Sequence, residues 1–165
     1  MQFQNAIMDP TSAHSIVMNL ALSEAAAAFQ EEEVPVGAVL ISESGLVLAS
    51  THNRTISLSD PTAHAEILAL RHAAKQIQNY RLLKTTLYVT VEPCMMCMGA
   101  IIHARVSRLV YGAGDSKWGA AGSLYDLSAD NRLNHCLEVI PGVCETKCRE
   151  ILQRFFRDRR SHPIG

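Results

Sequence analysis

The sequence has no long hydrophobic run, and none of its apolar stretches approaches the roughly 20 residues that a helix needs to cross a bilayer. Its first residues contain no basic segment followed by an apolar one, so we expect no secretory signal and a cytoplasmic protein. Net charge is also nearly absent, with 15 Lys and Arg against 16 Asp and Glu. This balance argues against binding of nucleic acid by overall charge alone, although it permits a local basic patch.

An even set of cysteines is also absent: there are five, and two of them form the pair Cys94-x-x-Cys97. In a chain without an expected export signal, this spacing favours metal or redox chemistry over a disulfide framework. Internal repeats and low-complexity linkers are absent as well. We therefore expect one domain over residues 1–165, with a loose lead-in over residues 1–11.

Hydrophobic periodicity predicts helices interleaved with strands. We expect helices over 12–29, 62–78, 93–104 and 143–160, and strands over 36–41, 46–49, 86–91, 108–111 and 136–140. The acidic run Glu31-Glu32-Glu33 is expected to close the first helix in solvent. Such alternation predicts an α/β fold, a three-layer α/β/α sandwich with helices on both faces of a five-stranded mixed sheet.

The chemistry is concentrated in Pro61-Thr62-Ala63-His64-Ala65-Glu66 and in Pro93-Cys94-Met95-Met96-Cys97. One imidazole and two thiolates can hold a zinc ion and leave its fourth position open, as catalytic zinc sites do. That position would take water, whose pKa falls toward neutrality on zinc. Glu66 lies two residues from the histidine, so we expect it to move protons beside the metal rather than bind it.

Two other interpretations of these residues are possible. A closed structural zinc site would need a fourth ligand, and the candidates are Cys136, Cys144, Cys148 or His135. A structural site gains nothing, however, from a carboxylate two residues after the histidine. A thioredoxin-like redox pair would not require the His-Ala-Glu motif at all.

The pair of motifs, His-x-Glu with Pro-Cys-x-x-Cys, is the signature of the zinc nucleobase deaminases. Beyond it, the sequence resembles the bacterial tRNA-specific adenosine deaminases of the cytidine deaminase superfamily, from about Val34 to Arg160. The resemblance includes the segments 33–39, 60–66, 79–82, 86–90, 92–94, 112–113, 119–123 and 155–157.

This resemblance implies a cytidine-deaminase-like fold, one Zn²⁺ per subunit, and hydrolysis of the wobble adenosine of a tRNA anticodon stem-loop to inosine. It implies a homodimer in which the third helix, with Met98 and His103, lies near the partner. The resemblance also assigns residues to three roles. His64, Cys94 and Cys97 would bind the metal, Glu66 would be catalytic, and Asn53, Asp115, Lys117, Phe156, Arg157 and Arg160 would contact the substrate.

Two residues depart from the family pattern, Gly114 and Trp118, and the indole of Trp118 could either stack on a splayed base or cover the core. The arginines at positions 149, 154, 157, 159 and 160 form either a solvated helix end or a patch that contacts the RNA backbone. The competing functions are a free-base deaminase of the guanine type, which shares the 60–66 motif, and a zinc-stabilised RNA-binding module without catalysis. The loop 119–123 and the basic last helix count against the first, and Glu66 counts against the second.

Overall fold

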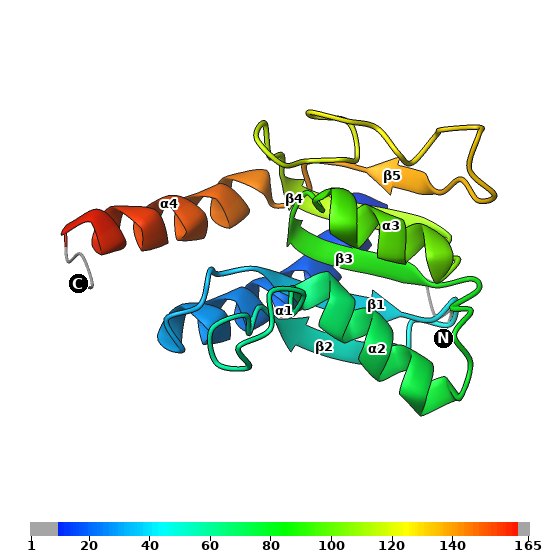
Figure 1. Ribbon diagram of the computed structural model, residues 1–165, viewed down its shortest axis with the longest axis horizontal. Helices are drawn as coiled ribbons and strands as arrows, with labels where there is room; N and C mark the ends of the chain where they lie inside the picture. The colour runs from blue at the N-terminus through cyan, green and yellow to red at the C-terminus, as the bar shows by residue number, and fades with distance from the viewer. Residues whose placement is uncertain (1–9, 162–165) are drawn as a thin grey trace, which may run out of the picture.

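The computed structural model describes residues 10–161 and contains a five-stranded sheet between two layers of helices (Figure 1). The elements follow in the order α1 (Pro10–Gln30), β1 (Gly37–Ile41), β2 (Val47–His52), α2 (Ala65–Ile77), β3 (Thr86–Val91), α3 (Met95–His103), β4 (Arg108–Ala113), β5 (Glu138–Ile140) and α4 (Glu145–Ser161). Residues 1–9 of the expected lead-in lie outside the described residues. Its last two residues, Pro10 and Thr11, are helical, so that part of the prediction is wrong.

The sheet has the strand order β2-β1-β3-β4-β5 and is mixed, as predicted. Strand β1 is antiparallel to β2 and β3, whereas β3, β4 and β5 are parallel to one another. The carboxyl ends of β2, β3 and β4 therefore meet the amino end of β1 at one edge of the sheet. Polar residues that follow these strands are brought together there.

Alternation of side chains along the strands fills both faces of the sheet. Val39, Tyr88 and Val110 pack with α1 and α4, and the neighbouring Leu40 and Leu87 pack with α2 and α3. In Figure 1, α2 and α3 lie in front of the sheet and α1 runs behind it. Each fully buried aliphatic side chain stabilises this sandwich by about 1.5–3 kcal/mol. No described helix combines the length and apolarity needed to cross a membrane.

The element boundaries differ from the prediction where strand pairing or a polar side chain sets them. Strand β2 continues through Ser50-Thr51-His52 because it pairs with β1 as far as Gly37. Strand β5 begins at Glu138, where its pairing with β4 begins. Helix α2 begins only at Ala65, because Asp60 accepts hydrogen bonds from both the backbone N–H and the hydroxyl of Thr62 and holds a turn there.

Close packing fixes helix α4 against β4 and α1. A Cβ at Gly112 would collide with the sulfur of Cys148, so glycine allows the helix to approach the strand. Farther along α4, Phe155 packs edge-on against Phe29, with ring centroids 5.6 Å apart. Helix α4 continues beyond the sheet in Figure 1, so its C-terminal part is not covered by the strands.

Candidate metal centre and substrate cavity

Two helix N-termini converge at the edge of the sheet where the strands end. His64 is the N-cap residue of α2 and Cys94 is the N-cap residue of α3. An N-cap side chain usually accepts a hydrogen bond from its own helix, but neither of these side chains does. Both instead point to the space between the helices, where the positive helix ends favour thiolate over thiol.

The three predicted ligands meet as expected. The ligand atoms of His64, Cys94 and Cys97 all lie within 4.8 Å of one another. Nδ1 of His64 is 3.5 Å from the sulfur of Cys97 and 3.8 Å from that of Cys94. A tetrahedral zinc with ordinary Zn–N and Zn–S bonds requires an N···S separation of about 3.6 Å, so this triad has the dimensions of a metal site.

The sulfurs differ in protonation within this triad. The pKa of Cys94 falls to about 4, mainly because the Cys97 thiol hydrogen-bonds to its sulfur, and His64 adds to the effect. The pKa of Cys97 rises because it is the partner in that hydrogen bond and is buried. The Cys94 thiolate therefore stands next to the His64 imidazole, and with Cys97 as a second sulfur ligand these groups are the donor set of a soft divalent metal.

Glu66 lies beside this triad without belonging to it. Its side chain is buried, and its Oε2 atom has no hydrogen-bond partner within the described chain. Burial raises the pKa of Glu66 to about 7. A buried carboxylate oxygen without a partner is costly for the fold, so its retention here indicates a role in binding or chemistry.

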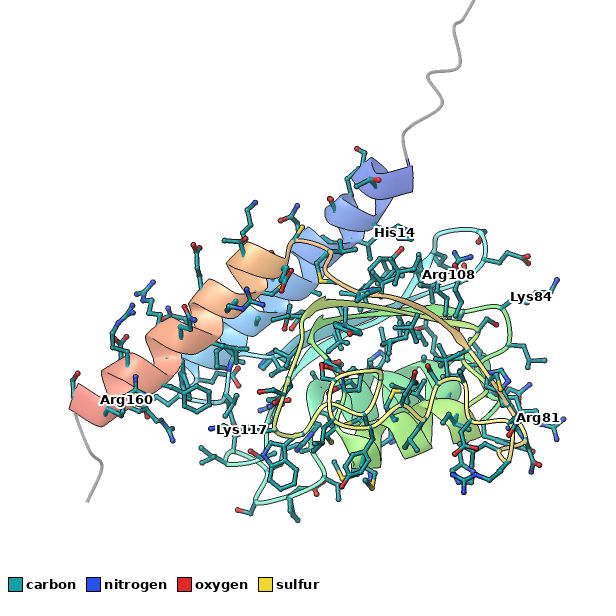
Figure 2. All side chains as sticks on the ribbon, turned by 90° about the horizontal axis from the view of Figure 1, so that it is seen from above. His14, Arg81, Lys84, Arg108, Lys117 and Arg160 are labelled. Carbon is teal, nitrogen blue, oxygen red and sulfur yellow. The ribbon has the colours of Figure 1, made fainter. Side chains whose placement is uncertain are left out.

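A cavity of about 1120 Å³ opens in front of the centre. It is lined by His64, Glu66 and Cys94 together with all of the residues predicted to contact the substrate: Asn53, Asp115, Lys117, Phe156, Arg157 and Arg160. Cys97 lies beneath the cavity and is fully buried. The structure thus brings every predicted site residue to one place. Figure 2 shows Lys117 and Arg160 at the same end of the molecule.

Asn53 contributes to the fold and to the cavity at once. Its Oδ1 atom accepts a hydrogen bond of 2.8 Å from the backbone N–H of Ala65, the first residue of α2. This contact holds the helix that carries His64 and Glu66. The Nδ2 amide donates to none of the described residues, so it is available to a ligand in the cavity.

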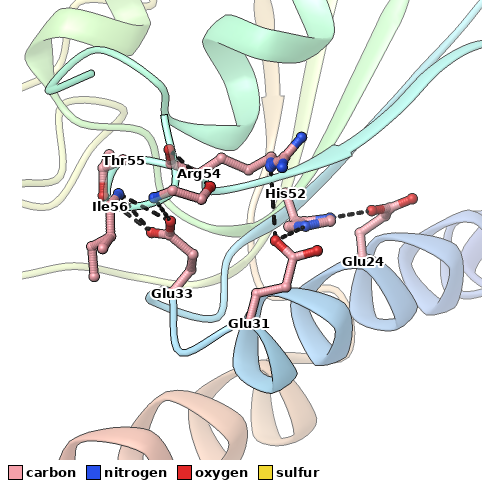
Figure 3. Close-up of polar contacts among 8 residues, drawn as sticks. Glu24, Glu31, Glu33, His52, Arg54, Thr55 and Ile56 are labelled. Atoms are coloured by element: carbon pink, nitrogen blue, oxygen red, sulfur yellow. Dashed lines mark hydrogen bonds and ion pairs between the residues drawn. The ribbon is translucent and has the colours of Figure 1, made fainter. Parts of the chain in front are cut away.

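The loop after Asn53 is held by a carboxylate that we expected to lie in solvent. Glu33 is fully buried, and it accepts hydrogen bonds from the backbone N–H groups of Ile56 and Ser57 and from the Thr55 hydroxyl (Figure 3). The predicted solvated acidic run is therefore wrong for this residue. The chain turns after α1, and this turn directs Glu33 into the loop.

His52 anchors the same segment to α1. Its Nδ1 atom lies 2.7 Å from Oε2 of Glu24, and its Nε2 atom lies 3.1 Å from Oε2 of Glu31 (Figure 3). Burial disfavours the imidazolium, but the hydrogen bonds to the two carboxylates outweigh it and raise the pKa of His52. The residue next to Asn53 is therefore fixed by contacts through both of its ring nitrogens.

A second buried carboxylate, Glu92, holds the opposite wall. It accepts hydrogen bonds from the backbone N–H groups of Asp115 at 3.0 Å, Ala121 at 3.0 Å and Ser123 at 2.9 Å, and from the Ser123 hydroxyl. The sequence patterns above predicted no role for Glu92. The one signal that could have found it is a charged residue placed directly after a buried strand and just before Pro93.

Helix α4 forms the third wall and divides the predicted arginine cluster. Arg149, Arg157 and Arg160 line the cavity with Phe156. Arg154 and Arg159 do not; they lie over the rings of Phe29 and Phe155. Gln153 was missed as a cavity residue, although it lies four positions from both Arg149 and Arg157 and therefore on the same face of the helix.

Met98, which was predicted to lie near a partner, is fully buried in the core of its own chain, so its side chain offers no contact surface. His103, the other residue of that prediction, is exposed. It lines a groove of about 340 Å³ between α2 and α3, together with Ile67, Leu70 and Tyr80.

Comparisons with known proteins agree with this geometry. A family model described as MafB19-like deaminase matches residues 12–160. The tRNA-specific adenosine deaminase of Haemophilus influenzae is 52% identical over 87% of this chain and 83% of its own length. A solved chain from a study of A-to-I editing by tRNA:A34 deaminases at the wobble position superimposes with a TM-score of 0.79, at 46% identity over 82% of this chain and 97% of that one. Guanine deaminase from Bacillus subtilis gives a TM-score of 0.60, at 35% identity over 67% of this chain and 70% of that one. This chain therefore belongs to the family of tRNA-specific adenosine deaminases.

Proposed function

We propose that this protein hydrolyses adenosine to inosine at the wobble position of a tRNA anticodon stem-loop and releases ammonia. One observation carries the proposal: a single cavity is lined by two members of the triad, His64 and Cys94, by Glu66, and by the basic face of α4, which consists of Arg149, Arg157 and Arg160. Its volume of about 1120 Å³ exceeds the roughly 300–1,000 Å³ that is usual for small-molecule sites. A cavity of this size and charge suits a nucleotide within a polynucleotide better than a free base.

The metal in this proposal is one Zn²⁺ per chain, held by His64, Cys94 and Cys97. The donor types and the N···S separations of 3.5 and 3.8 Å fit zinc, and Glu66 is left over as a group that does not ligate. When bound, zinc supplies a Lewis acid that lowers the pKa of water toward neutrality. Three protein ligands leave the fourth position for chemistry.

Glu66 is the proposed proton carrier. Replacing an exocyclic amine by oxygen requires a group that moves two protons in turn: one from the attacking water to the ring nitrogen, and one from the new hydroxyl of the adduct to the amine that leaves as ammonia. The Oε2 atom of Glu66 is buried, has no partner within the described chain and lies in the cavity wall. A carboxylate in this position can perform both transfers within one turnover.

The remaining residues are proposed to hold the RNA. The free amide of Asn53 can donate a hydrogen bond to the target nucleoside, while its Oδ1 atom stays bonded to α2. Lys117, Arg157 and Arg160 can neutralise phosphates, and Asp115 and Phe156 border the same space. The base must leave its stack to reach Glu66, as in other enzymes that react with a base.

A substrate panel tests the proposal. The zinc-loaded protein is incubated with an anticodon stem-loop that has adenosine at the wobble position, and in parallel with guanine, adenine and cytidine. The proposal predicts inosine in the stem-loop and no ammonia from the free bases or cytidine. Ammonia from guanine alone would instead support the free-base alternative, to which the similarity with guanine deaminase points. RNA binding with no product would support a binding module.

We further propose that the fold is one domain over residues 1–165, that it acts in the cytoplasm where tRNA is used, and that it forms a homodimer. The apolar groove between α2 and α3, which His103 lines, is the proposed contact surface. Light scattering on the wild type and on His103→Glu tests the dimer. A monomeric wild type would rule it out.

A further inference from the structure

We infer that Trp118 is a stacking platform for the nucleobase next to the reacting adenosine, an inference that rests on the proposed function. Trp118 is the sole tryptophan of the chain, and it is 70% exposed. It lines the substrate cavity, and its ring contacts no other described aromatic ring or cation. The sequence left open that the indole covers the core, and its exposure shows that it does not.

The backbone fixes where the indole lies relative to the metal centre. Gly119, the next residue, pairs with the ligand Cys94 in an isolated β-bridge. The backbone N–H of Ala120 donates a hydrogen bond of 2.9 Å to the carbonyl oxygen of Pro93. Trp118 therefore directly precedes the residues that are bonded to the segment of Pro93 and Cys94. These bonds fix the position of its backbone relative to the proposed metal ligands, and so relative to the place where the base would react.

Contacts within the chain hold the loop that carries Trp118. Oδ1 of Asp115 accepts hydrogen bonds from the backbone N–H groups of Lys117 at 2.9 Å and Trp118 at 3.2 Å. A Cβ at Gly119 would collide with the Glu92 carboxylate, so only glycine lets the loop lie this close to its anchor. A base that stacks here need not order the loop first, which reduces the entropic cost of binding.

The charge around the indole favours a nucleobase over another occupant. Lys117, Arg157 and Arg160 line the same cavity and can contact the phosphates on either side of a splayed base. Single-stranded RNA binders combine such a basic groove with exposed aromatic side chains. The rival occupant is a second copy of this chain, and the experiment separates the two.

The single tryptophan makes the test direct, since all tryptophan fluorescence comes from this residue. The zinc-loaded Glu66→Ala protein, which leaves the RNA unconverted, is titrated with the stem-loop while Trp118 emission is recorded. We expect saturable quenching. The quenching should disappear at saturation when one of the two nucleotides flanking the adenosine, on its 5′ or 3′ side, is replaced by an abasic site.

Affinity supplies the second measurement. Trp118→Ala should weaken binding of the intact stem-loop about 5- to 150-fold, Trp118→Phe less, and the alanine effect should vanish on the RNA with that abasic site. Leu124→Ala is the matched control: this side chain is 49% exposed on the same loop, does not line the cavity, and should leave affinity unchanged.

Two results together overturn the inference: the wild type forms inosine, and adding Trp118→Ala to the Glu66→Ala protein leaves its affinity for the stem-loop unchanged. It is also overturned if Trp118→Ala lowers the oligomeric mass and neither abasic site changes the quenching, because the indole then belongs to a protein interface. Absence of inosine with the wild type would instead reject the proposed function itself.

Discussion

Replacing Glu92 with glutamine tests whether one buried carboxylate holds the cavity wall formed by residues 114–123. The substitution keeps the size of the side chain but replaces one of its two hydrogen-bond-accepting oxygens by an NH₂ group, which can only donate. In the native protein, Oε1 accepts from the N–H groups of Ala121 and Ser123, and Oε2 accepts from the N–H of Asp115 and the Ser123 hydroxyl. Every contact to the carboxylate is made by a donor.

The cost follows from these contacts. A glutamine amide offers one accepting oxygen, and its NH₂ group would face N–H donors in either orientation. At least one backbone N–H is then left unpaired, at about 1–3 kcal/mol, and the remaining bonds lose their charge assistance. We expect Glu92→Gln to lower the free energy of unfolding by about 3 kcal/mol, which is a fall in Tm of about 6–12 °C for a chain of this size.

Thermal and urea unfolding of the zinc-loaded proteins measures the effect, with Trp118 emission as a local probe of the same loop. Glu43→Gln is the control, because Glu43 is exposed and only faces Lys84 at 3.4 Å, a contact worth at most about 1 kcal/mol. A Glu92→Gln protein within about 0.5 kcal/mol of the wild type would refute the anchoring role of Glu92.

Three further predictions concern the metal, His52 and the basic face of α4. Chelation should remove one zinc per chain and lower the free energy of unfolding by about 4 kcal/mol, as measured by thermal unfolding. The reference is protein in free zinc at a thousand times the Kd of the protein for zinc. Because folding raises the pKa of His52, its contacts stabilise the folded state fully at pH values below the ordinary pKa of 6.5. This stabilisation is lost as the pH rises through the higher pKa of the folded state. The stability lost in His52→Gln should therefore be largest in acid, and urea midpoints that differ equally at all pH values would contradict this. Arg160→Ala should raise KM for the stem-loop with little change in kcat. It should also reduce the slope of log affinity against log salt concentration by about one. Arg154, which lies over Phe29, is the control, and Arg154→Ala should leave this slope unchanged.

Much of the fold and the cluster of His64, Cys94 and Cys97 could be predicted from the sequence, because their signals are local. In the strand run 86–91, for example, three consecutive buried residues, Leu87, Tyr88 and Val89, are apolar. The histidine and the two cysteines stand at the starts of helices, so the edge of the sheet brings them together. The spacing of Phe156, Arg157 and Arg160 likewise places them on one face of a helix, because residues three and four positions apart are neighbours on its surface.

The two loop-anchoring carboxylates could not be predicted in this way. Glu33 and Glu92 act on residues more than 20 positions away in the chain, through backbone N–H groups that have no sequence signature. A run of three glutamates is usually solvated, and only the turn after α1 buries the third one. Exposure of Trp118 is also a tertiary property, since an apolar ring gives no local sign of the face on which it lies.

The site formed by Glu66 and the His64–Cys94–Cys97 triad is proposed to deaminate adenosine in RNA by hydrolysis. The most direct test is to run the reaction with the stem-loop in heavy-oxygen water and to analyse the digested nucleosides by mass spectrometry. We predict inosine that carries one heavy oxygen from the solvent with the wild type, and unchanged adenosine with Glu66→Ala, which still binds the RNA. Inosine without solvent oxygen, or equal turnover by Glu66→Ala, would contradict the account.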